Sequence, residues 1–181
     1  SACAAATMSD GALPENPTCP TKIKVMDSKA AAGGAGLIAL AAARWASQGL
    51  SLDQVVAGVE QMAPKVNLLA YLDTLRYLSR SGRVHKIAGW AGTMLSIKPL
   101  TELKLGEARM LERPRSRAKA QERLLAVMRQ RVADRPIVVN VMEAYAVEEA
   151  QKLSERIQSE FNCHEIIVSQ FTPVMGLQDR K

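Results

Sequence analysis

Histidine, cysteine and aromatic residues are scarce in this chain of 181 residues, and their scarcity excludes several classes of site. The two histidines, His85 and His164, have no second histidine or Cys-x-x-Cys pair beside them. Cys3, Cys19 and Cys163 are widely separated and lack metal-ligand spacing. Zinc binding is therefore not expected, and the odd number of cysteines is typical of reduced thiols in a cytoplasmic protein.

Long hydrophobic segments are also missing. The apolar run at residues 30–43 (AAAGGAGLIALAAA) is too short to span a bilayer, which takes about 20 residues. The N-terminal stretch ACAAATM has no positively charged residues before it and is too short for the core of a signal peptide. We therefore expect a soluble protein without a membrane span.

Catalytic motifs are absent as well, since the chain has no Gly-x-Ser-x-Gly elbow, no Walker loop and no paired-histidine metal motif. Gly33, Gly34 and Gly36 precede a helix-like run, but GGAG does not match the dinucleotide fingerprint, and close helix packing is the alternative. Asp27 and Ser28 follow a short apolar stretch, a place where α/β proteins bind ligands. Capping of the next helix by either side chain is an equally good interpretation.

Positive charge is abundant, with 24 Lys and Arg against 18 Asp and Glu, and nine of these cations lie between residues 109 and 135. Such a charge admits a phosphate or carboxylate ligand, nucleic acid, a membrane surface or an acidic protein as partner. Arg113, Arg115 and Arg117 occupy alternate positions. This spacing favours the exposed side of an edge strand, with phosphate binding as the alternative.

Periodicity and capping signals predict an α/β fold. The expected helices are residues 31–48, 52–62, 74–79, 117–132 and 147–161. The expected strands are residues 23–26, 66–72, 96–100, 137–142 and 166–171, with a hairpin of residues 100–105 and 108–112 around a Gly106-Glu107 turn. Ser51 and Gln54 fit a capping box, and Gly49 fits a helix C-terminus.

The most informative segment is DTLRYLSRSGRV at residues 73–84, followed by IKPL at residues 97–100. Gly82 is expected to end a short helix, so that Arg83 follows at a fixed corner, where its charge can also compensate the negative end of the helix. The two segments resemble the motifs DTLxYLxxxGRI and IKPI of the DegV family of bacterial fatty-acid-binding proteins. Residues 23–36, 112–120 and 171–176 (IKVMDSKAAAGGAG, ERPRSRAKA and FTPVMG) resemble further family segments in the same order.

The resemblance implies two domains. Residues 1–72 would be the end of an N-terminal parallel-sheet domain, and residues 73–181 a C-terminal α/β domain with a mixed sheet flanked by helices. It also implies a chain truncated at both ends, because the family continues beyond the aligned segment on either side. Leu177 stands where the family has a histidine, and the strand end near Met142 also lacks the histidine found in many relatives.

Family members hold one long-chain fatty acid, such as palmitate, in an apolar tunnel between domains, and some are the acyl-carrying subunit of bacterial fatty acid kinase. The resemblance therefore implies a fatty acid as ligand and an ATP-binding kinase subunit as partner, with no catalysis, cofactor or metal in this chain. It places Arg83 near the carboxylate and the kinase, and Lys98 in the Lys-Pro loop. Met94, Leu95 and Ile97 would line the tunnel.

Asp27 and Ser28 complete the predicted fatty-acid-binding residues. Two other functions stay open: a basic nucleic-acid-binding module, and a fragment of a phosphotransfer enzyme of the dihydroxyacetone-kinase type. Few aromatics and no recognition motif argue against the first. The lack of a phosphate loop or of a carboxylate cluster for magnesium argues against the second.

Overall fold

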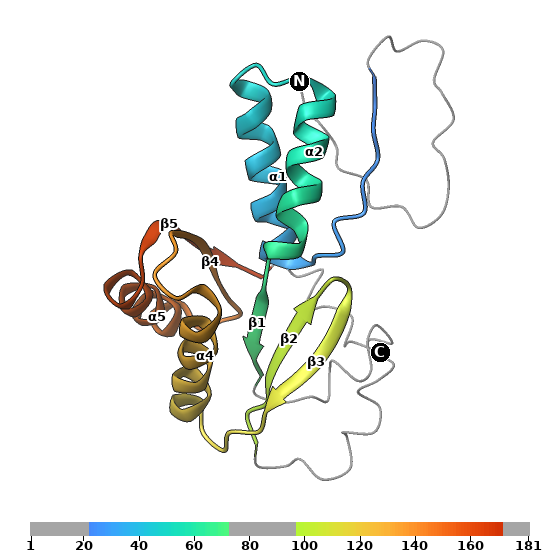
Figure 1. Ribbon diagram of the computed structural model, residues 1–181. Coiled ribbons are helices and arrows are strands. Elements are labelled where there is room, and N and C mark those ends of the chain that lie inside the picture. Colours follow the sequence, from blue (N-terminus) through green and yellow to red (C-terminus); the bar gives the residue numbers. More distant parts are fainter. Residues whose placement is uncertain (1–21, 73–96, 172–181) are drawn as a thin grey trace.

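The computed structural model describes residues 22–72 and 97–171 (Figure 1). Within these ranges the chain forms four α-helices, one 3-10 turn and five strands, which confirms the α/β class. The strands lie in two separate sheets, one antiparallel and one parallel, instead of a single mixed sheet. The helix predicted at residues 74–79 and the residues Gly82, Arg83, Met94, Leu95 and Leu177 lie outside the described part. The domain boundary after Leu72 stays a prediction.

The first two helices form an antiparallel hairpin, α1 (Ala32–Ser47) and α2 (Leu52–Met62), followed by the 3-10 turn η1 (Ala63–Lys65) (Figure 1). The predicted capping box is confirmed: Ser51 Oγ accepts from the Gln54 amide, and the Ser51 amide donates to Gln54 Oε1 at 2.8 Å. Gly49 follows α1 with φ +88°, a backbone conformation that favours glycine. None of the helices in the described part is long and apolar enough to cross a bilayer.

The antiparallel sheet contains β1 (Leu68–Tyr71), β2 (Leu100–Lys104) and β3 (Glu107–Glu112), in the order β1-β2-β3. The hairpin between β2 and β3 turns at Leu105 and Gly106, with φ +52° and +80°. Two central residues with positive φ are typical of a two-residue hairpin turn. The predicted Gly106-Glu107 turn is wrong by one position, because Glu107 already pairs with Lys104.

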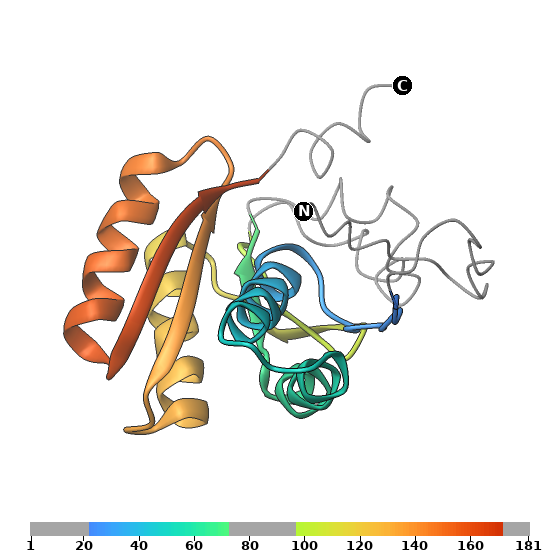
Figure 2. The same ribbon diagram turned by 90° about the horizontal axis from the view of Figure 1, so that it is seen from above.

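The parallel sheet consists of β4 (Ile137–Glu143) and β5 (Cys163–Gln170), joined by α5 (Val147–Glu160). Seen from above, α5 covers one face of this sheet and α1 lies at the other (Figure 2). The remaining helix, α4 (Arg117–Val132), packs against β1 and β2. Ion pairs from Arg117 to Glu149 and from Arg156 to Glu122 join α4 to α5.

One hydrophobic core links both sheets. It includes residues of α4, α5, β2 and β4, namely Leu100, Leu124, Leu125, Val141, Ala150, Leu153 and Ile157. Leu100, Leu125 and Ile157 have side chains that are fully buried. Leu100 belongs to the antiparallel sheet, whereas Val141 belongs to the parallel one, so the same cluster holds the two sheets together.

Three strand predictions need correction. Residues 23–26 form no strand, and Ile23 is 70% exposed, because no described strand lies beside this segment to accept its backbone hydrogen bonds. The strand expected at residues 96–100 starts only at Leu100. The alternating Arg113, Arg115 and Arg117 are not on a strand, since β3 ends at Glu112 and Arg117 begins α4.

Candidate functional site

One described part of the predicted site is the Lys-Pro segment directly before β2, with Ile97 and Lys98. The Lys98 amide donates to the Pro114 carbonyl at 2.7 Å, and the Leu72 amide donates to the Pro99 carbonyl at 3.1 Å. Pro99 is buried, while Ile97 and Lys98 are half-buried. The segment is therefore fixed between the end of β1 and the connection from β3 to α4.

Asp27 and Ser28 lie on the segment that leads into α1. Asp27 Oδ1 accepts a hydrogen bond from the Lys29 amide at 2.8 Å, and Ser28 Oγ accepts one from the Ala30 amide at 3.3 Å. The N-cap of α1 is Ala31, which has no side-chain cap. Capping of the helix by Asp27 or Ser28 was thus a wrong interpretation, because both side chains bond to the backbone before the helix starts.

The start of α1 packs closely on β4. The Gly33 amide donates to Met142 Sδ at 3.0 Å, and Ser169 Oγ donates to Asn140 Oδ1 at 2.7 Å. A Cβ on Gly33 would lie 2.8 Å from both Asn140 Nδ2 and Met142 Sδ. Close packing, one of the two interpretations of the glycine run, is confirmed at Gly33. The side chains it contacts follow more than 100 residues later, so no local sequence signal could reveal them.

Most of the positive charge between residues 109 and 135 is neutralised. Five of its nine cations pair with glutamates, in the pairs Arg109–Glu107, Arg117–Glu149, Arg123–Glu112, Arg129–Glu160 and Arg131–Glu102. Arg135 donates to the Val132 carbonyl at the end of α4. A guanidinium that already binds a glutamate is less available to bind a phosphate. This segment therefore offers nucleic acid fewer phosphate contacts than its composition indicates.

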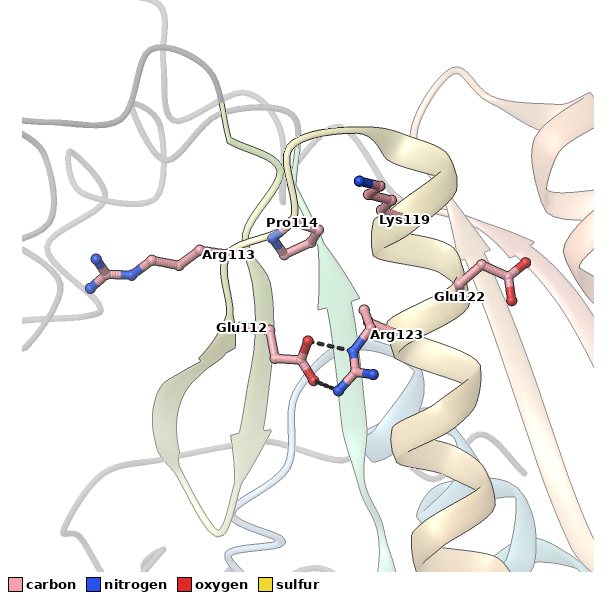
Figure 3. A pocket seen from close by; sticks show the side chains of 6 residues that line it. All are labelled: Glu112, Arg113, Pro114, Lys119, Glu122 and Arg123. Atoms are coloured by element: carbon pink, nitrogen blue, oxygen red, sulfur yellow. Dashed lines mark hydrogen bonds and ion pairs between the residues drawn. The ribbon is translucent and has the colours of Figure 1, made fainter.

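A surface cavity of about 320 Å³ lies between the β3–α4 connection and the first turns of α4 (Figure 3). Its lining residues are Glu112, Arg113, Pro114, Lys119, Glu122 and Arg123. A second cavity of about 280 Å³ lies at the β2–β3 hairpin and is lined by Glu102, Lys104, Leu105, Glu107 and Arg109. Charged side chains predominate in both, whereas an acyl chain needs an apolar lining. Neither cavity is the predicted tunnel.

The described residues contain no group of three His, Cys, Asp or Glu side chains that could hold a metal ion. Cys163 is half-buried at the start of β5, and its Sγ donates to the Glu165 carbonyl at 3.3 Å. Burial raises the pKa of the Cys163 thiol, which keeps it protonated and weakly nucleophilic.

Comparison with known proteins decides the family. Residues 1–178 match the family model described as "Uncharacterised protein, DegV family". The chain belongs to the DegV family. It is 32% identical over 149 residues to a DegV domain-containing protein of Streptomyces coelicolor, covering 82% of this chain and 53% of that relative. It spans about half the length of the curated relatives it matches.

Two solved DegV structures share the fold. One is described as the fatty acid binding of a DegV family protein from Thermus thermophilus, with a TM-score of 0.73 and 28% identity over 83% of this chain and 55% of that one. The other is DegV, a fatty acid binding protein from Bacillus subtilis, with a TM-score of 0.71 and 26% identity over 84% of this chain and 55% of that one. The DegV resemblance recognised from the sequence motifs is thus confirmed.

The predicted DegV site residues are only partly described. Ile97 and Lys98 lie together on the fixed Lys-Pro segment, and Asp27 and Ser28 lie on the segment before α1. Arg83, Met94 and Leu95 lie outside the described residues. The sequence did not predict the cavity at the start of α4. Pro114, which lines this cavity, accepts a hydrogen bond from the Lys98 amide of the Lys-Pro segment.

Proposed function

We propose that this DegV protein binds one long-chain fatty acid, such as palmitate, and presents its carboxylate to a separate ATP-binding kinase subunit, without catalysis of its own. The observation that carries the binding part is the similarity to the Thermus thermophilus protein, 28% identical with a TM-score of 0.73 and described by its fatty acid binding. The presentation to a kinase rests on the DegV motifs at residues 73–84 and 97–100.

The acyl chain would lie along Ile97, with Met94 and Leu95 before it. Two backbone hydrogen bonds fix the Lys-Pro segment, from Lys98 to Pro114 and from Leu72 to Pro99. A fixed wall keeps its apolar surface aligned with the ligand and lowers the entropy cost of binding. Burial of the acyl chain contributes about 0.8 kcal/mol per methylene, which is ample for tight binding.

The polar end of the ligand would face Arg83, and Asp27 and Ser28 are the further polar candidates. The Ser28 hydroxyl still has its proton to donate, because its oxygen only accepts from the Ala30 amide. A guanidinium such as that of Arg83 binds a carboxylate with two parallel hydrogen bonds, which would set the direction of the acyl chain. Lys98, half-buried beside the tunnel wall, would add positive charge near this end.

Bound fatty acid is the direct test of the binding proposal. The chain purified from a bacterial host should release a stoichiometric long-chain fatty acid on denaturation and solvent extraction, measured by mass spectrometry. Ile97→Glu should lose the bound fatty acid, because binding of the acyl chain would bury the new carboxylate without a partner, at a large cost in free energy. Ile23→Glu is the matched control, since Ile23 is 70% exposed. A folded chain without fatty acid, or equal lipid in both variants, would contradict the proposal.

The role of Arg83 is tested separately with the kinase subunit of a bacterial fatty acid kinase. Arg83→Ala should keep its bound lipid, because burial of the acyl chain supplies most of the affinity. It should form acyl phosphate at least about tenfold more slowly, since the two charge-assisted hydrogen bonds to the carboxylate are lost. Lys152→Ala, at an exposed cation of α5, controls for the change in net charge. Unchanged acyl phosphate formation in Arg83→Ala would refute the presentation of the carboxylate by this residue.

A further inference from the structure

Three cations around the start of α4 lack an ion-pair partner within the described ranges. Arg113 and Arg115 lie on the connection from β3, and Lys119 lies in the first turn of the helix. Arg113 Nε donates only to the thioether of Met110, at 3.3 Å, and a thioether is a weak acceptor. We name Arg113, Arg115 and Lys119 the basic cluster.

The carboxylates beside the basic cluster are engaged elsewhere. Glu112 binds Arg123 through two hydrogen bonds of 2.6 and 2.7 Å, and this contact holds the pKa of Glu112 below its usual range. Glu122 binds Arg156 on α5 at 2.6 Å, and Figure 3 shows its carboxylate pointing away from Lys119. Neither carboxylate therefore neutralises Arg113 or Lys119.

The backbone that carries the basic cluster is fixed at both ends. The Pro114 carbonyl accepts from the Lys98 amide at 2.7 Å, and Ser116 Oγ accepts from the Lys119 amide at 3.2 Å as the N-cap of α4. Between these points lies the cavity of about 320 Å³ (Figure 3). Lys119 also lies in the first turn of α4, where the helix dipole disfavours a cation, so a bound anion would offset the repulsion between the Lys119 ammonium and the dipole.

We propose that the basic cluster and its cavity form a binding site for a phosphate group. A phosphate offers several acceptor oxygens, which suit the planar donors of an arginine together with the ammonium of a lysine. Figure 3 shows the Arg113 guanidinium pointing away from Lys119, so the Arg113 side chain would turn toward the cavity and exchange its thioether contact for a phosphate oxygen. The same chemistry fits free phosphate and the headgroup of phosphatidic acid. A compact anion matches the small volume of this open surface hollow, about 320 Å³.

Binding of phosphate to the full chain is measured by titration calorimetry at low salt. Wild type should bind inorganic phosphate saturably. Arg113→Gln and Lys119→Gln should each weaken it about tenfold, the cost of one charge-assisted hydrogen bond. Lys152→Gln is the matched control, because Lys152 is an exposed cation of α5 outside the cavity lining and should leave the affinity unchanged. Circular dichroism and fatty acid content of each variant separate this site from the fold and from the proposed lipid tunnel.

Co-sedimentation with phosphatidylcholine vesicles, with and without phosphatidic acid, distinguishes the two sources of phosphate. Binding of inorganic phosphate alone identifies a soluble phosphate compound as the ligand class, and binding only to phosphatidic acid vesicles identifies the headgroup. The proposal is overturned if neither binds. It is equally overturned if Lys152→Gln weakens binding as much as Lys119→Gln, or if polyglutamate binds through the cluster and neither phosphate source does.

Discussion

Replacing Leu125 with alanine is expected to destabilise the protein by about 2–5 kcal/mol, the range for a leucine in a closely packed core. Leu125 is fully buried on α4, in the cluster that contains Leu100 of β2, Val141 of β4 and Ile157 of α5. The cavity left by the missing carbons would border on elements of both sheets, and these cannot all move inward together. Denaturant unfolding followed by far-ultraviolet circular dichroism measures the change.

A leucine outside this core provides the control. Leu52 begins α2 and is 40% exposed, so Leu52→Ala should change the free energy of unfolding by about 0.5 kcal/mol or less. If Leu125→Ala costs no more than this control, then α4 does not pack against β2, β4 and α5 in the way described, and the two sheets do not share one core.

The elements predicted best from the sequence are those with local causes. The helices α2 and α4 begin and end at the predicted residues. The reason is visible at their starts, where Ser51 and Gln54 form the capping box and Ser116 caps α4. A cap, an apolar face and a following proline or charge run all act within a few residues, so the sequence contains the whole signal.

The predictions that failed depend on neighbours in space. The short apolar stretch at residues 23–26 is compatible with a strand, but a strand also requires a second backbone beside it, and residues 22–72 and 97–171 provide none there. The edge strand predicted from the alternating Arg113, Arg115 and Arg117 also depended on a neighbouring backbone. The chain leaves the sheet after Glu112, and the arginines follow a loop instead.

Charge also misled the interpretation from composition. Arg129 pairs with Glu160, 31 residues later, and Arg131 pairs with Glu102, 29 residues earlier. Such pairs cannot be read from the order of residues, so a segment with nine cations looked far more basic than it is. The candidate site was predictable in a different way. The DegV motifs indicated Ile97, Lys98 and Arg83. Phosphate binding by Arg113 and Arg115 was an alternative from their spacing, and the structure added Lys119 and showed that Arg117 pairs with Glu149.

Replacing Gly33 with alanine is expected to cost about 1–2 kcal/mol, although alanine is the better helix former. The added Cβ would lie 2.8 Å from Asn140 Nδ2 and Met142 Sδ. Overpacking of this kind costs about 1–3 kcal/mol, and the gain in helix propensity offsets up to about 1 kcal/mol of it. Met142 can change rotamer, but Asn140 is held by its hydrogen bond with Ser169, so relief is incomplete.

Gly36 is the matched control because it lies on the same helix with no atom within 4 Å of a Cβ. Gly36→Ala should therefore stabilise the protein by about 0.5–1 kcal/mol, through helix propensity alone. A double-mutant cycle of Gly33→Ala with Met142→Ala isolates the clash, since the shorter side chain makes room for the new methyl group. Parallel stabilisation by both glycine replacements would mean that α1 does not lie on β4. If Gly33→Ala destabilises the protein, Gly36→Ala stabilises it and Met142→Ala restores part of the lost stability, the contact with β4 is the reason for a glycine at position 33.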